Sequence, residues 1–191
     1  MVSIRHLQQR LAAAARALGA SLAISLAACC GAGGGPGEPD SAAAEFLGAD
    51  AVALLAAPDR IESFRVKRPL DRPIDPARAL AGVERLADGP LLDAAQTALV
   101  RDLLFAEDSY LFELAKGCIP TPGVLLRAWR GDRFADLYLC FECQMWAVTV
   151  DTPADRFPLG REWEDFDPVQ RQLVALVKAL FPADAAIQAL R

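Results

Sequence analysis

Three cysteines in the second half of the chain, Cys118, Cys140 and Cys143, are the residues whose type and spacing could do chemistry. In an oxidising compartment two of them would form a structural disulfide, either Cys118–Cys143 or Cys118–Cys140. The C-x-x-C spacing of Cys140 and Cys143 is also that of thiol–disulfide redox pairs, although such thiols usually lie at the beginning of a helix. A zinc site with an Asp or Glu as the fourth ligand is a third interpretation. The three interpretations stay open at this point.

Two more cysteines, Cys29 and Cys30, follow a segment typical of an export signal. The segment carries basic residues up to Arg16 and continues with an apolar run shorter than the roughly 20 residues that cross a bilayer. Its end resembles the lipobox of bacterial lipoproteins, Leu26-Ala27-Ala28-Cys29. The resemblance implies cleavage before Cys29 and lipidation of its sulfur atom. Two other interpretations are an ordinary signal peptide cleaved at an A-x-A-like site, which leaves both cysteines as thiols, and an uncleaved membrane anchor.

Lipidation of Cys29 would place the protein at the cell envelope. The multiply acylated cysteine that the resemblance implies anchors a protein stably to a membrane. Residue 30 is Cys rather than Asp, which by resemblance to Gram-negative lipoproteins implies sorting to the outer membrane. Residues 29–44 are rich in Gly, Ala and Pro and are expected to form a flexible tether. The expected partners are the membrane, through the acyl anchor, and an unknown envelope protein or ligand near it.

The remaining residues, 45–191, are expected to form a single domain, because 191 residues that are 53% hydrophobic suffice for one core. Residues 1–28 hold three basic side chains and no acidic one, so the rest of the chain carries 17 Lys and Arg against 25 Asp and Glu. This acidic balance argues against nucleic-acid binding. The one histidine, His6, lies in the predicted signal, which excludes imidazole catalysis from the mature domain. We therefore expect a binding or structural module without a cofactor rather than an enzyme.

The most informative stretch for the fold is a predicted β-hairpin with Gly-Asp at residues 131–132. Gly at the first turn position predicts a two-residue turn, so Arg130 should pair with Arg133 and Arg127 should face Asp136. One face of the hairpin is then apolar below its tip, while the other carries an opposite-charge pair and an aromatic pair. This pattern predicts that helices cover the apolar face.

Local patterns predict the other elements. Asp93 with Gln96 three residues later is a capping-box pattern and predicts a helix that ends near Phe105. Asp167 followed by Pro168 predicts the beginning of a last helix. Two further strands are expected at residues 61–67 and 145–150. The expected fold is an α+β domain with an antiparallel sheet of three to four strands and helices packed on one face.

The segment from Cys118 to Cys143 also resembles uncharacterised bacterial proteins that share a Cys/Pro-Gly-Val/Cys-Phe-x-Cys pattern. In this chain the pattern is carried by Cys118, by residues 122–124 and by residues 140–143. The resemblance covers this segment alone and implies no activity.

Two clusters of charged residues have a structural and a functional interpretation. Basic residues between positions 60 and 72 could contact anionic headgroups, but the acidic residues among them favour a solvated strand face. A second cluster could hold a carbohydrate or a cation around Trp163, but the first turn of a helix favours acidic residues on its own. The acidic members of this cluster are Glu162, Glu164, Asp165 and Asp167.

Overall fold

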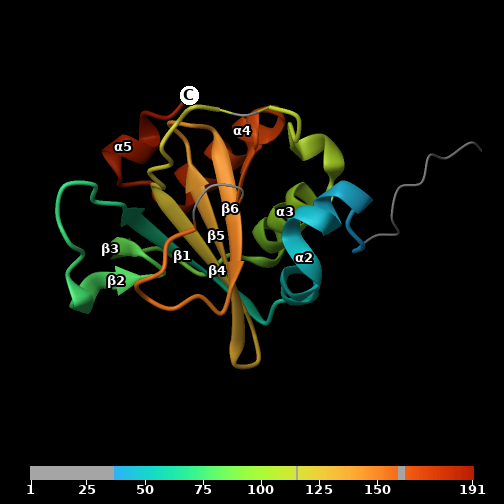
Figure 1. Ribbon diagram of the computed structural model, residues 1–191, viewed down its shortest axis with the longest axis horizontal. Coiled ribbons are helices and arrows are strands. Elements are labelled where there is room, and N and C mark those ends of the chain that lie inside the picture. Colours follow the sequence, from blue (N-terminus) through green and yellow to red (C-terminus); the bar gives the residue numbers. More distant parts are fainter. Residues whose placement is uncertain (1–36, 115, 159–161) are drawn as a thin grey trace, which may run out of the picture. The chain divides into compact units, whose positions relative to one another are not determined.

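The computed structural model describes residues 37–114, 116–158 and 162–191. The predicted signal segment, the lipobox and Cys29 lie outside these residues. The described residues combine helices with one large antiparallel sheet, which confirms the expected α+β class (Figure 1).

The sheet has seven strands in the order β2-β3-β1-β4-β5-β6-β7, so the expected number of three to four was wrong. Figure 1 labels the strands β1 to β6 of this sheet. The strands predicted from alternation are all present. The three that were missed are short or carry few apolar side chains, so they show no clear period of two. The strands are β1 Arg60–Lys67, β2 Ala79–Leu80, β3 Val83–Asp88, β4 Val124–Arg130, β5 Arg133–Cys140, β6 Met145–Val150 and β7 Trp163–Asp165.

The β4–β5 hairpin has the predicted register. Arg130 pairs with Arg133 and Arg127 pairs with Asp136, and Gly131 in the turn has a φ of 62°. Such a left-handed conformation favours glycine, which explains why the turn needs this residue. The alternation of side chains then separates an apolar face from a face that carries the Arg127–Asp136 ion pair.

The helices share one apolar core with the central strands. Buried residues of every described α-helix belong to the same cluster as Leu126 of β4, Leu137 of β5 and Trp146 of β6. In Figure 1 α2 and α3 lie next to each other against the central strands. The helices are α2 Ser41–Ala56, α3 Ala94–Phe105, α4 Gln170–Leu180 and α5 Ala185–Gln188.

The helix α2 begins inside the segment 29–44, which was expected to form the tether. Ala43 is fully buried in the core, and the Asp40 amide donates a hydrogen bond to the Phe105 carbonyl over 2.8 Å. A composition rich in alanine is shared by tethers and by buried helices, so composition alone does not separate the two. The packed part of the chain therefore includes residues 41–44.

A second, smaller core lies on the other face of the sheet. It contains Leu125, Tyr138 and Trp163, which the strands β2 and β3 help to cover. The Tyr138 hydroxyl donates a hydrogen bond to the Ala81 carbonyl over 2.8 Å. Next to it Gly82 has a φ of 73°, and a Cβ atom at this position would overlap the backbone of Arg156. The turn between β2 and β3 therefore requires glycine, both for its backbone conformation and for the space beside Arg156.

The C-terminal helix α5 is joined to the sheet by an ion pair between Arg65 and Asp184, with Nε and Oδ2 2.6 Å apart. Asp184 also accepts a hydrogen bond from the Ile187 amide and so caps α5. The hydrogen bond from Arg65, followed by that from Ile187, holds the pKa of Asp184 below its usual value. This carboxylate thus stabilises the folded state only while it is ionised.

We expect Asp184→Asn to lower the free energy of unfolding by about 1–2 kcal/mol at pH 7, because a charged cap and pair are replaced by a neutral amide. A carboxyl whose pKa is lowered by folding adds stability above its unfolded-state pKa, and this stability is lost as the pH falls through the folded-state pKa. The difference between variant and parent should therefore vanish well below pH 3.8, the ordinary value. Urea titrations at pH 7 and near pH 2.5 measure it, with Asp71→Asn on the surface as control. An equal difference at both pH values would contradict the assignment.

Candidate functional site

A wide groove with a volume of about 1330 Å³ opens beside helix α2. Its other walls are the 3-10 helix η2, Glu107–Ser109, the residues that follow η2, and the strands β6 and β7. Pockets for small molecules usually have volumes of about 300–1,000 Å³, so this groove is large for such a ligand. Its lining combines aromatic, aliphatic and acidic side chains from distant parts of the chain.

Three aromatic side chains form one wall of the groove: Phe46, Tyr110 and Phe112. The rings of Tyr110 and Phe112 are stacked with their centroids 4.6 Å apart, and Phe46 lies edge-on to Tyr110 at 5.4 Å. The Tyr110 hydroxyl donates a 2.6 Å hydrogen bond to the Leu104 carbonyl, which fixes the orientation of the ring. Burial, followed by the charge of Glu164, raises the pKa of Tyr110. Tyr110 is itself buried, so it stays neutral and holds the partly exposed rings of Phe46 and Phe112 in place at the groove.

Aliphatic side chains continue this surface along the segment that follows η2. Among the described residues six large hydrophobic side chains are exposed, and three of them lie in residues 111–119. Leu111 and Leu114 line the groove with 39% and 50% of their surface exposed, and Ile119 farther along is 66% exposed. Exposed apolar side chains that gather on one surface, as Leu111 and Leu114 do in the groove, mark interaction sites.

Four carboxylates also line the groove, and they come from different elements: Glu45, Glu107, Glu113 and Glu164. Within the described part of the chain, none of the four has a basic side chain within ion-pair distance. Burial, followed by the charge of Asp165, raises the pKa of Glu164. The groove therefore presents uncompensated negative charge to whatever enters it.

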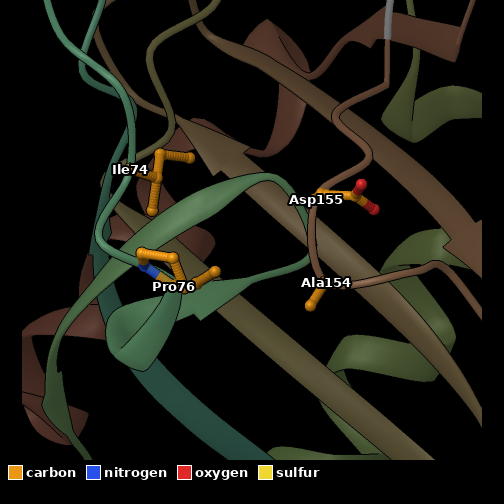
Figure 2. Close-up of a pocket in the computed structure, with 5 residues that line it drawn as sticks. Ile74, Pro76, Ala154 and Asp155 are labelled. Carbon is orange, nitrogen blue, oxygen red and sulfur yellow. The ribbon is translucent and has the colours of Figure 1, made fainter.

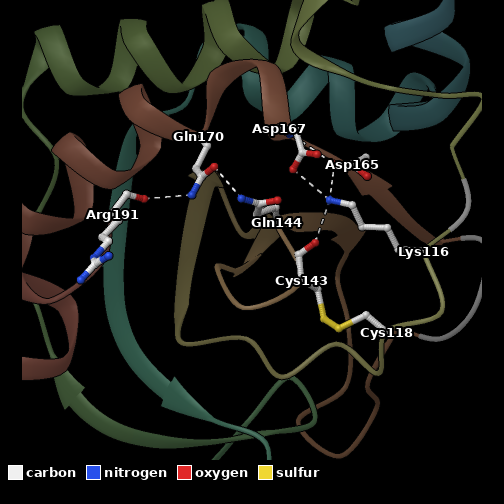
Figure 3. A network of polar contacts seen from close by, with 8 residues as sticks. All are labelled: Lys116, Cys118, Cys143, Gln144, Asp165, Asp167, Gln170 and Arg191. Carbon is white, nitrogen blue, oxygen red and sulfur yellow. Dashed lines mark hydrogen bonds and ion pairs between the residues drawn. A yellow bond between two sulfur atoms is a disulfide. The ribbon is translucent and has the colours of Figure 1, made fainter.

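The basic side chain that lines the groove in the described residues, Lys116, is occupied by internal contacts (Figure 3). Its Nζ donates to Asp165 Oδ1 at 2.8 Å, to Asp167 Oδ1 at 2.9 Å and to the Cys143 carbonyl at 2.9 Å. An ammonium group has three protons, and these contacts use all of them. Burial lowers the pKa of Lys116. Its hydrogen bonds and ion pairs with the two aspartates raise the pKa by more than burial lowers it, so the net shift is upward. Lys116 thus fixes the groove wall and does not neutralise the glutamates.

A disulfide joins Cys118 to Cys143 two residues farther along the same segment (Figure 3). Their Cα atoms are 6.0 Å apart, and Cys118 is exposed while Cys143 is buried. Of the two disulfides that the sequence allowed, the structure contains this one. Because Cys140 pairs with Met145, residues 141–144 form a turn, which takes Cys143 out of the strand and close enough to Cys118 for a disulfide.

Cys140 stays a free, fully buried thiol on β5. Its sulfur accepts a hydrogen bond from the Thr121 amide over 3.3 Å. The C-x-x-C pair therefore has one member buried and the other, Cys143, already bonded to Cys118. Nothing in this arrangement favours the redox interpretation.

The other sequence candidates have structural partners. Trp163 is buried with its indole N–H donating to the Pro158 carbonyl, so it offers no exposed stacking surface to a sugar. In the basic run, Arg60 pairs with Glu62, and Arg68 lies 3.9 Å from the centre of the Phe157 ring. In the described residues no group of three or more His, Cys, Asp and Glu side chains is placed to hold a metal ion.

Comparisons of the chain with protein families, with curated proteins and with solved structures found no match. Among the described helices none is both long enough and apolar enough to cross a bilayer. Any role of the groove is therefore argued from the residues that line it. Sequence reasoning identified Glu164 and the segment near Cys118 but missed the aromatic wall, because Phe46 and Tyr110 are far apart in the chain and lie in no recognisable motif.

A second, smaller pocket of about 400 Å³ lies near strand β2 (Figure 2). Its lining is mostly aliphatic, with Asp155 as its one charged side chain among the described lining residues. None of its described lining residues is aromatic. The groove beside α2 is therefore the stronger candidate for a binding site.

Proposed function

We propose that the protein is a bacterial lipoprotein, anchored to the outer membrane through an acylated Cys29, whose domain is a binding module facing the envelope. The observation that carries this proposal is the sequence Leu26-Ala27-Ala28-Cys29 directly after a basic and then apolar segment. In the domain, helices cover one face of the sheet, and the groove beside α2 is the surface where a partner binds.

Two features of the domain support this proposal. The disulfide of the exposed Cys118 is of a kind that persists in oxidising compartments outside the cytoplasm. The groove combines exposed apolar surface with unpaired carboxylates, which is a surface suited to binding a partner. The described residues contain no histidine, so no imidazole is placed to act as a base beside it.

Lipidation is tested by expressing the chain in a Gram-negative host that is fed a palmitate analogue suitable for labelling. We expect the protein to incorporate the label and to fractionate with the outer membrane. Cys29→Ser should abolish both labelling and signal cleavage, because the sulfur atom that receives the lipid is gone. Cys30→Ser is the matched control and should be labelled like the parent. An unlabelled parent chain, or a labelled Cys29→Ser variant, would refute the anchor.

A further inference from the structure

The groove beside α2 has a chemistry that specifies its partner more closely. We propose that it binds a cationic amphipathic segment of another protein, with Lys or Arg side chains against the glutamates and apolar side chains against the aromatic wall. This inference names the partner class of the binding module proposed above and rests on that function.

The charge of the groove indicates a cationic partner. Glu45 of α2, Glu107 of η2, Glu113 and Glu164 of β7 converge on one groove from four places in the fold. Lys116 is saturated by Asp165, Asp167 and a backbone carbonyl, so it does not balance them. A positively charged ligand would supply the missing counter-charges, while an anionic headgroup or a nucleic acid would be repelled.

The aromatic and aliphatic lining indicates that this partner is amphipathic. A polycation without apolar groups would leave Leu111, Leu114 and the open part of Phe112 in contact with water, whereas an amphipathic segment would cover them. The faces of aromatic rings also attract guanidinium and ammonium groups, so the wall can contact both kinds of side chain. An amphipathic helix places such side chains three and four residues apart, which is the usual way in which a groove binds a peptide.

The size of the groove indicates a peptide segment. At about 1330 Å³ it exceeds the usual range for small molecules of about 300–1,000 Å³. Its wall is also fixed in place, because the segment that follows η2 is held by the Cys118–Cys143 disulfide and by Lys116. A preformed groove binds a peptide without ordering its own backbone first, which lowers the entropic cost of binding.

The test uses the mature lipidated protein in a neutral detergent, with empty micelles as reference. Three fluorescent peptides of equal length are compared by anisotropy: a Leu/Lys amphipathic helix, a Leu/Glu helix with the same pattern, and a Ser/Lys peptide without apolar residues. We expect the Leu/Lys peptide to bind at least about tenfold more tightly than either of the others. Binding should weaken as salt is raised, because part of the attraction is between exposed charges.

Charge reversal in the groove gives the specific readout. The double variant Glu45→Lys/Glu113→Lys should raise the Kd of the Leu/Lys peptide by about tenfold or more, since two attractions become repulsions. Asp71→Lys/Asp132→Lys changes the net charge equally on exposed loops that do not line the groove and should leave the Kd unchanged. Leu114→Ser should raise the Kd by a few fold through lost apolar contact. Circular dichroism confirms that each variant is folded.

Three results would overturn the inference. They are equal binding of the Leu/Lys and Leu/Glu peptides, equal weakening by both double variants, and absence of peptide binding. In the last case, self-association that Glu45→Lys/Glu113→Lys abolishes would identify a second copy of this chain as the occupant. Lipidation is measured independently, so a lipidated protein that binds no peptide refutes this inference and leaves the anchor intact. Peptide binding by a protein that is not lipidated would refute the anchor and leave this inference intact.

Discussion

Replacing Arg127 with leucine is expected to lower the free energy of unfolding by about 3–5 kcal/mol, because it leaves a buried carboxylate without its partner. Arg127 contacts Asp136 through two parallel hydrogen bonds, Nε to Oδ1 at 2.7 Å and Nη2 to Oδ2 at 2.8 Å. Asp136 is fully buried on β5, so water cannot replace the lost guanidinium. Urea titration of parent and variant at pH 7 measures the loss.

The pH dependence and a double variant make this prediction specific. Burial already raises the pKa of Asp136 against the opposing effect of Arg127, so removing Arg127 should raise the pKa further. When folding raises the pKa of a carboxyl, protonation of that carboxyl stabilises the folded state. Arg127→Leu should therefore regain free energy of unfolding as the pH falls from 7 toward 5. The double variant Arg127→Leu/Asp136→Leu should be far more stable than Arg127→Leu, since no buried charge remains. A double variant as unstable as Arg127→Leu would show that packing rather than charge is responsible.

Loss of the disulfide is the second large effect. The bond closes a loop of 25 residues, and loop-closure entropy predicts that Cys118→Ser/Cys143→Ser costs about 3.5 kcal/mol. The same variant should weaken peptide binding, because the segment that carries Leu114 loses its covalent link to the turn after β5. Thermal unfolding with and without a reducing agent measures the effect. Reduction should destabilise the parent chain and leave the variant unchanged; equal effects on both would contradict the assignment.

The parts of the fold that the sequence predicted correctly are those set by neighbouring residues. In the capping box, the Gln96 amide donates to Asp93 Oδ1 at 2.8 Å and the Asp93 amide donates to Gln96 Oε1 at 3.0 Å, as expected. The register of the β4–β5 hairpin follows from its two-residue turn. In each case the deciding contact spans a few residues, so the local pattern contains the information.

The parts that were missed depend on contacts between distant segments. Strand β3 exists because β1 and β2 pair with it, although only Val83 and Glu84 of its residues are buried. The sequence did not decide which cysteine bonds to Cys118, because the pairing depends on the turn that follows Cys140. The groove joins α2 to a segment more than 60 residues later. Periodicity and spacing describe a segment on its own and contain no information on such pairings.

The two strands at the edges of the sheet are also its shortest, with two residues in β2 and three in β7. Long exposed edge strands let one sheet extend into another and so promote aggregation. A lipid anchor, as proposed for Cys29, would concentrate many copies in two dimensions and bring their edges together often. These two strands offer few free backbone groups for pairing between copies, and the part of β3 that extends past β2 carries the charged side chains Arg85 and Asp88. The domain should therefore resist edge-to-edge aggregation even when it is densely packed on a membrane.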